Sequence, residues 1–139
     1  MIDAFVVDAS TAVAWVHRGQ ATAESDAWLL HAEAGADLVV PALWPLEVTN
    51  ALIALQRRRK LTPHERDQAL ETLGALALTL DHEAAARAFT ELAELAVRES
   101  MTMYDTTYLE LALRRALPLA CKDGPLRAAA SRLRVRVTP

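Results

Sequence analysis

Four acidic residues occupy positions from which their carboxylates could act together: Asp8, Glu47, Asp105 and Asp123. No cysteine or histidine cluster accompanies them in the sequence. Hard oxygen ligands of this kind select Mg²⁺ or Mn²⁺ over zinc. A divalent cation held by a few carboxylates and waters is suited to chemistry on phosphate groups.

Asp8 follows the apolar run at residues 5–7, which is typical of a buried strand. Two interpretations of Asp8 are open, a cap for the next helix or a ligand beyond the end of the strand. Ser10 offers a competing cap, which would leave the Asp8 carboxylate free to point into a crevice.

Glu47 lies in the stretch 46–55, a helical pattern with hardly any polar face. Asn50 follows at the spacing that places both side chains on one face of a helix. A buried, unpaired carboxylate costs several kcal/mol, so Glu47 needs a cation, strong donors or water. The alternative is an acid in the first helical turn, stabilised by the helix dipole.

The other two acids also have structural alternatives. Asp105 stands three residues after Thr102, which resembles a capping box. Asp123 precedes Gly124 and Pro125, a pattern typical of a turn or of the start of a helix. Each acid is a weak signal alone, and the four together are a stronger one.

The elements that must position these acids alternate along the chain. The pattern predicts short strands at residues 5–7, 38–40, 78–80, 118–120 and 135–137. It predicts helices at about 10–17, 22–34, 46–60, 62–77, 81–98, 102–115 and 125–133, with Asp81 as the cap of the fifth. Strands separated by helices indicate a parallel sheet with helices on both faces, an α/β class, and chemistry in such sheets gathers beyond the carboxyl ends of the strands.

Composition limits the remaining possibilities. The 139 residues fit one domain spanning 1–139, and 53% hydrophobic residues suffice for a core. A single cysteine, Cys121, excludes an internal disulfide, and no apolar run is long enough to cross a bilayer. We therefore expect a cytoplasmic protein with no membrane partner. The net charge of −3 does not favour a polyanion partner, although the basic run at residues 57–60 is either a solvated helix end or a local contact for phosphates.

Four segments in order resemble the PIN-domain family, and in particular its VapC branch of ribonuclease toxins from toxin–antitoxin pairs. They are residues 6–10 (VVDAS), 46–52 (LEVTNAL), 104–109 (YDTTYL) and 119–126 (LACKDGPL). The resemblance covers nearly the whole chain. It implies a three-layer α/β/α sandwich around a short parallel sheet, with Mg²⁺ or Mn²⁺ at an acidic site.

The resemblance assigns the acidic quartet to Asp8, Glu47, Asp105 and Asp123, with Ser10 and Asn50 as supporting polar residues. It implies hydrolysis of RNA by a cation-activated water that leaves a 3′-hydroxyl and a 5′-phosphate. The family often has Thr or Ser two residues before its last acid, where this chain has Cys121. Because a thiol is a poorer hydrogen-bonding group than a hydroxyl, we expect weaker positioning of Asp123.

The resemblance also implies partners, namely an RNA substrate, a small cognate antitoxin and a second copy of the chain in a homodimer. Trp15, Trp28 and Trp44 could offer an apolar surface to a partner helix, or they could fill the core. Two other functions stay open, a housekeeping PIN nuclease without an antitoxin and a non-catalytic PIN-like module that binds RNA or protein.

Overall fold

A computed structural model of the chain describes residues 1–122 and 124–139. Its centre is a four-stranded sheet in the order β3-β2-β1-β4, with every neighbouring pair parallel. The strands are β1 (Ala4–Val7), β2 (Asp37–Pro41), β3 (Leu78–Asp81) and β4 (Leu119–Ala120). The predicted parallel α/β class is therefore confirmed.

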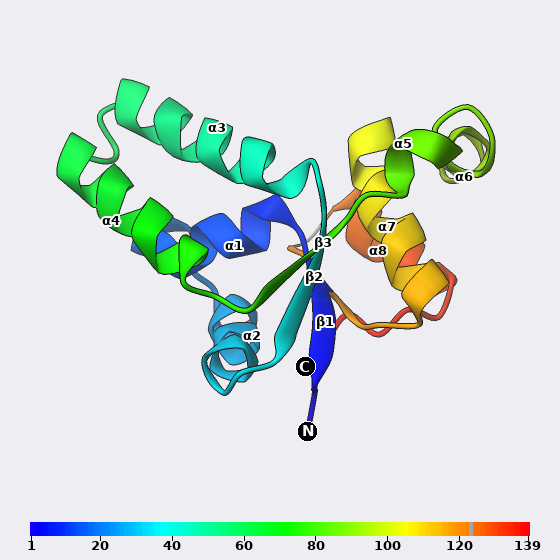
Figure 1. Cartoon of the computed structure of the whole chain (residues 1–139), viewed down its shortest axis with the longest axis horizontal. Coiled ribbons are helices and arrows are strands. Elements are labelled where there is room, and N and C mark those ends of the chain that lie inside the picture. The colour runs from blue at the N-terminus through cyan, green and yellow to red at the C-terminus, as the bar shows by residue number, and fades with distance from the viewer. Residues whose placement is uncertain (123) are drawn as a thin grey trace.

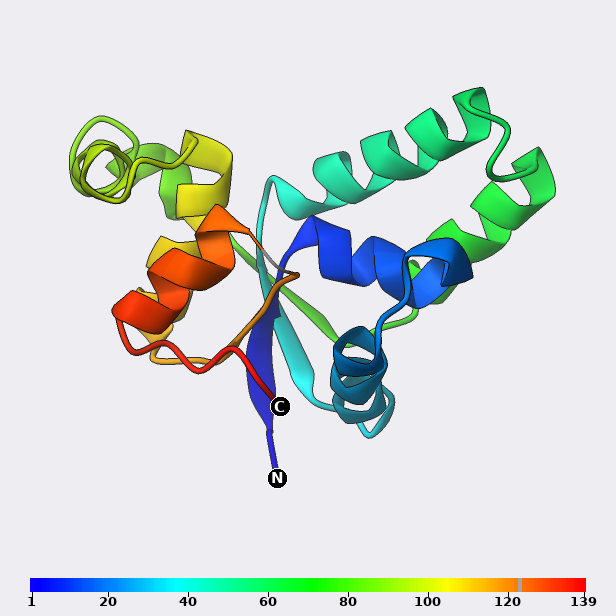
Figure 2. The ribbon, with the colours of Figure 1, turned by 180° about the vertical axis from the view of Figure 1, so that it is seen from behind.

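Helices cover both faces of the sheet (Figures 1 and 2). One layer contains α1 (Ala9–Val16), η1 (Arg18–Gln20), α2 (Ala23–Glu33), α3 (Trp44–Arg57) and α4 (Pro63–Gly74). The other contains α5 (Ala84–Arg87), α6 (Glu91–Glu99), α7 (Met103–Arg115) and α8 (Pro125–Arg132). The result is a three-layer α/β/α arrangement, and α1, α3 and α7 all begin near the carboxyl edge of the sheet (Figure 1).

Local sequence signals fix several helix starts. The Thr22 and Thr62 hydroxyls accept hydrogen bonds from the backbone N–H groups of Ser25 and Glu65, and both helices have reciprocal capping boxes. Pro63 then occupies the first turn of α4, where a missing N–H costs nothing. These caps explain why α2 and α4 begin where the sequence predicts.

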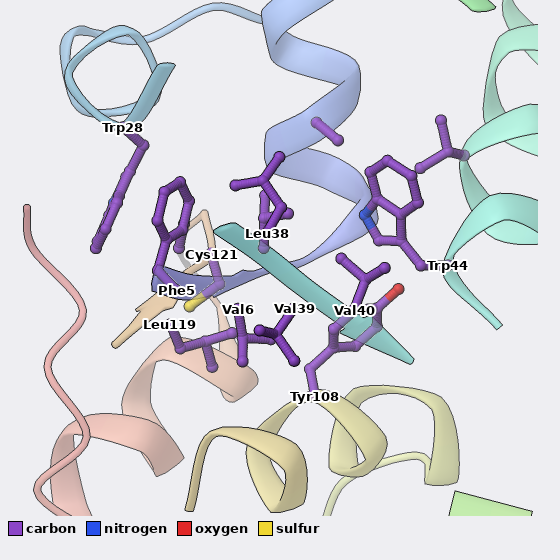
Figure 3. Close-up of a cluster of buried hydrophobic side chains, with 14 of the residues drawn as sticks. Phe5, Val6, Trp28, Leu38, Val39, Val40, Trp44, Tyr108, Leu119 and Cys121 are labelled. Carbon is purple, nitrogen blue, oxygen red and sulfur yellow. The ribbon is translucent and has the colours of Figure 1, made fainter. Parts of the chain in front are cut away.

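The core lies on both faces of the sheet (Figure 3). Phe5 packs against Trp28 with ring centroids 4.7 Å apart on the side of α1 and α2. Val6 and Val39 point to the opposite side, toward α7 (Figure 3). Full burial of both faces accounts for the nearly continuous apolar sequence of β1 and β2, as expected for a covered parallel sheet.

One predicted helix differs from the structure. The pattern at residues 81–98 forms two helices, α5 and α6, because the chain turns at residues 88–90 so that α6 can pack against α7. Asp81 ends β3 instead of capping a helix that starts beside it, and its carboxylate accepts hydrogen bonds from the guanidinium groups of Arg114 and Arg115. The predicted capping role is wrong because α5 begins only at Ala84, and the carboxylate binds these cations together with the backbone N–H of Glu83 at 3.3 Å.

The predicted final strand is also absent from the structure, where residues 133–139 are irregular. The backbone N–H of Leu119 donates to the Arg136 carbonyl at 2.9 Å. Because β4 has only two residues, it gives this segment too short an edge for a ladder. Within residues 1–122 and 124–139, no helix has the length and apolar character needed to cross a membrane.

Candidate active site

Three of the four predicted acids line one cavity of about 460 Å³. They are Asp8, Glu47 and Asp105. They come from the start of α1, the first turn of α3 and the first turn of α7. Ser10 lies in the same wall. Asp123, the fourth predicted acid, lies outside the described residues, although Lys122 and Gly124 on either side of it line the cavity.

Asp8 is the N-cap of α1, and this settles the choice of cap. Its Oδ1 atom accepts a hydrogen bond from the backbone N–H of Thr11 at 2.9 Å. The Ser10 hydroxyl donates to the Asp8 carboxylate, 3.0 Å from Oδ1 and 2.9 Å from Oδ2. The alternative in which Ser10 caps the helix is wrong, because the Ser10 hydroxyl donates to Asp8 instead. Asp8 therefore caps α1 and faces the cavity at once, and these two donors fix its orientation.

Glu47 is held by a residue that sequence reasoning did not assign to the site. The hydroxyl of Tyr108 donates to Glu47 Oε1 at 2.5 Å, and Tyr108 also lines the cavity. The Tyr108 ring is buried against the sheet, and its hydroxyl points toward the side on which Trp44 and α3 lie (Figure 3). One signal for Tyr108 was available, because it follows Asp105 by three residues and so shares a helix face with it.

Asp105 has only part of the predicted capping geometry. Its backbone N–H donates to Thr102 Oγ1 at 3.1 Å, so Thr102 caps α7. No hydrogen bond joins the Asp105 carboxylate to another residue within the described chain. Its side chain is therefore available to the cavity.

The carboxylates crowd one another electrostatically. Burial raises the pKa of Glu47, and the nearby charges of Asp105 and Asp8 raise it further, while the Tyr108 hydrogen bond opposes this change. Burial also raises the pKa values of Asp8 and Asp105. Such shifts mean that the charged forms are poorly compensated by the protein itself.

The donor set fits a hard cation that keeps much of its water. Across residues 1–122 and 124–139, no three His, Cys, Asp or Glu side chains are grouped closely enough to hold a metal ion by themselves. Magnesium, however, is usually bound through one or two carboxylates, with waters completing its shell. An open, polar cavity with three carboxylates in its wall meets that requirement.

Two cations border the same cavity, Arg58 and Lys122. The ammonium of Lys122 donates to the Gln20 carbonyl at 3.0 Å. Arg58, from the basic run at residues 57–60, is exposed just after α3. The sequence allows this run to be either a solvated helix end or a phosphate contact, and the structure places one member, Arg58, in the wall of the cavity that the acids line.

Two other predicted site features lie elsewhere. Asn50 is exposed one turn after Glu47 and is not among the residues that line the cavity. Cys121 is buried and lines a separate cavity of about 260 Å³. Burial raises the pKa of its thiol to about 12, so the thiol stays protonated at neutral pH.

The three tryptophans belong to the core. Trp15, Trp28 and Trp44 are each less than 10% exposed, and the Trp15 indole N–H donates to the Ser25 carbonyl at 2.8 Å. Their interpretation as core residues is confirmed, and they provide no surface for a partner helix.

Comparisons with known proteins agree with this fold. The family model described as PIN domain matches residues 5–131. The crystal structure of PAE2754 from Pyrobaculum aerophilum is similar, with a TM-score of 0.66 and 24% sequence identity over 92% of this chain and 84% of that chain. At this identity the likeness supports the fold alone. No protein of curated function matches the chain.

Proposed function

The chain belongs to the PIN domain family, and from this premise we propose that it is a metal-dependent endoribonuclease. PIN domains are generally nucleases, so the membership itself implies a nuclease-type function. The observation that supports this activity is the presence of Asp8, Glu47 and Asp105 in one open cavity, where no Lys, Arg or His side chain of residues 1–122 and 124–139 forms an ion pair with them. We include Asp123 as the fourth acid of the site from its place in the sequence.

Each described residue has a definite task in this proposal. Asp8 and Asp105 are the first choice for direct ligands of Mg²⁺ or Mn²⁺, while Glu47 completes the site directly or through water. Ser10 orients Asp8, and Tyr108 orients Glu47. When bound, a divalent cation would neutralise charge on the scissile phosphate and lower the pKa of a nearby water. Because burial removes part of the water around these carboxylates, a bound cation stabilises their charged forms.

We further propose that the chain is the toxin of a toxin–antitoxin pair, acting on cytoplasmic RNA as a homodimer. The support is its resemblance to VapC-type toxins in four segments. A carboxylate-rich cavity also suits inhibition by an arginine from a small partner protein, because a guanidinium can pair with two carboxylate oxygens at once. A housekeeping nuclease would have the same site and no such partner.

The proposal is tested by RNA cleavage with the purified protein. Cleavage should require Mg²⁺ or Mn²⁺, stop with EDTA and be lost in Asp8→Asn, because an amide holds a hard cation far less well than a carboxylate. Asn is also a good N-cap, so this variant should keep α1. The matched control is Asp3→Asn, an exposed acid just before β1 at the opposite edge of the sheet, which should cleave normally. Full cleavage by Asp8→Asn would rule out the proposed site, and a wild-type protein that binds RNA without cutting it would favour the non-catalytic module.

The toxin role needs a separate test in cells. Expression should arrest growth, a small neighbouring reading frame should relieve the arrest, and Asp8→Asn should be harmless. Harmless expression of a chain that cuts RNA in vitro would instead indicate the housekeeping nuclease.

A further inference from the structure

The acidic cavity extends along one face of α3. Glu47, Ala51, Ala54, Leu55 and Arg58 all line it. These positions differ by four, seven, eight and eleven residues from Glu47, which places them on one stripe of a helix. At about 1.5 Å per residue, Arg58 lies roughly 16 Å along the axis from Glu47. The cavity is therefore an elongated trough with an acidic end and a basic end.

The middle of this trough is lined by small and apolar side chains. The two alanines on α3, Ala51 and Ala54, are short, and Val13 of α1 lies in the wall as well. A nucleic-acid strand leaving the acidic end can run over such small side chains without a steric obstacle. Its next phosphates would then approach the end of α3.

Arg58 is suited to receive a phosphate there. It is exposed, and within the described part of the chain it forms no hydrogen bond or ion pair through its guanidinium. A guanidinium presents paired N–H donors that match phosphate oxygens.

We propose that Arg58 anchors a phosphate of the RNA strand several nucleotides away from the bond that is cut. This inference rests on the proposed ribonuclease function and adds a substrate requirement, because only an RNA long enough to span the trough can use the anchor. The contact is to the backbone, so it contributes affinity without base preference. The acids would hold the divalent cation that neutralises the reacting phosphate, and Arg58 holds the strand.

The test compares Arg58→Gln with Arg57→Gln. Arg57 is the preceding residue, is also exposed and shares the carboxyl end of the helix, but it does not line the cavity. With a substrate of about ten nucleotides, Arg58→Gln should raise KM about tenfold with little change in kcat, as expected for a lost charge-assisted hydrogen bond. With a dinucleotide, Arg58→Gln and wild type should have equal kcat/KM. Arg57→Gln should match wild type on both substrates.

Binding of the longer RNA in EDTA gives a second measurement that does not depend on cleavage. Loss of one phosphate contact should reduce the slope of log Kd against log salt by about 0.7 for a single strand in Arg58→Gln and leave it unchanged in Arg57→Gln. Equal slopes and equal KM values in the two variants would overturn the anchor, as would a wild-type chain that binds no RNA. RNA bound through Arg58 but never cut would overturn the ribonuclease function and leave the anchor in place.

Discussion

The hydroxyl of Tyr108 donates a hydrogen bond to the carboxylate of Glu47, and this bond joins α7 to α3 across 61 residues of sequence. Tyr108 is only 2% exposed, so its ring position is fixed by packing against the sheet. Burial, the hydrogen bond to Glu47 and the nearby acidic charges raise the pKa of Tyr108, so its hydroxyl remains a donor at neutral pH. Tyr108 is thus a positioning residue for the carboxylate that faces the cavity.

Tyr108→Phe should therefore reduce metal affinity or cleavage rate while preserving the fold. Loss of a residue that orients a metal ligand typically lowers metal affinity or activity 10- to 100-fold. We expect the lower end of this range because Glu47 is one of several acids in the site. The measurement is the Mg²⁺ concentration that gives half-maximal cleavage. The matched control is Tyr104→Phe, which alters an exposed tyrosine on the same helix and should change nothing. Identical metal dependence in the two variants would show that the Tyr108 hydroxyl has no positioning role.

Glu47→Gln should equal or exceed the parent in thermal stability at neutral pH in metal-free buffer. Folding raises the pKa of Glu47, so the folded state favours the protonated carboxyl group. The protonated Glu47 therefore stabilises the fold fully below the ordinary pKa of 4.5, and this stabilisation is lost as the pH rises through the raised pKa. The difference between Glu47→Gln and the parent should consequently vanish in acid and grow toward neutral pH. Thermal melts across this range check the sign. A large loss of stability at pH 7 would indicate that Glu47 serves a structural ion pair.

Added Mg²⁺ should stabilise the parent more than it stabilises Glu47→Gln. A ligand that binds only the native state raises the melting temperature in proportion to its binding free energy. The measurement is the shift in melting temperature at a fixed, saturating Mg²⁺ concentration. Equal shifts in the two proteins would remove Glu47 from the metal site.

Arg114→Met should destabilise the fold by about 3 kcal/mol, because it removes the cation that two largely buried carboxylates, Asp81 and Glu110, share and leaves Asp81 with Arg115 alone. Arg114 binds Asp81, Glu83 and Glu110, and Asp81 is only 2% exposed. Urea unfolding at pH 7 measures the loss. The control is Arg18→Met, which breaks the exposed pair of Arg18 and Asp26 and should leave the free energy of unfolding nearly unchanged.

The same network predicts an acid-sensitive contribution to stability. Hydrogen bonds from Arg114 lower the pKa of Asp81 to about 2 from the usual 3.8. Because the pKa is lowered, the ionised Asp81 stabilises the fold above pH 3.8, and this stabilisation is lost as the pH falls through about 2. A pKa shift of this size corresponds to roughly 2 kcal/mol of stability. Urea unfolding between pH 4 and pH 2 should show this loss in the parent and a flatter profile in Arg114→Met. Parallel profiles would contradict the assignment.

Much of the fold was predictable because its signals are local. The apolar runs that form β1 and β2, and the Thr22 and Thr62 caps, depend on residues within one turn or strand. The strand ends then indicate where Asp8 must lie, since parallel strands present their carboxyl ends at one edge.

The remaining features depend on distant partners. The role of Asp81 is set by Arg114, which lies 33 residues further along the chain. The bond from Tyr108 to Glu47 and the place of Arg58 at the end of the cavity both require the packing of α3 beside the sheet. No periodicity within one segment contains that information.

Manganese binding tests the central claim most directly, because it reports on the carboxylates without requiring the correct RNA. Calorimetric titration of Mn²⁺ into the parent, Asp105→Asn and Asp3→Asn would compare a cavity acid with an acid at the opposite edge of the sheet. Saturable binding in the parent and in Asp3→Asn, weakened at least tenfold in Asp105→Asn, is the predicted result. Binding that is absent from the parent, or equally strong in Asp105→Asn, would contradict a metal site built on these acids.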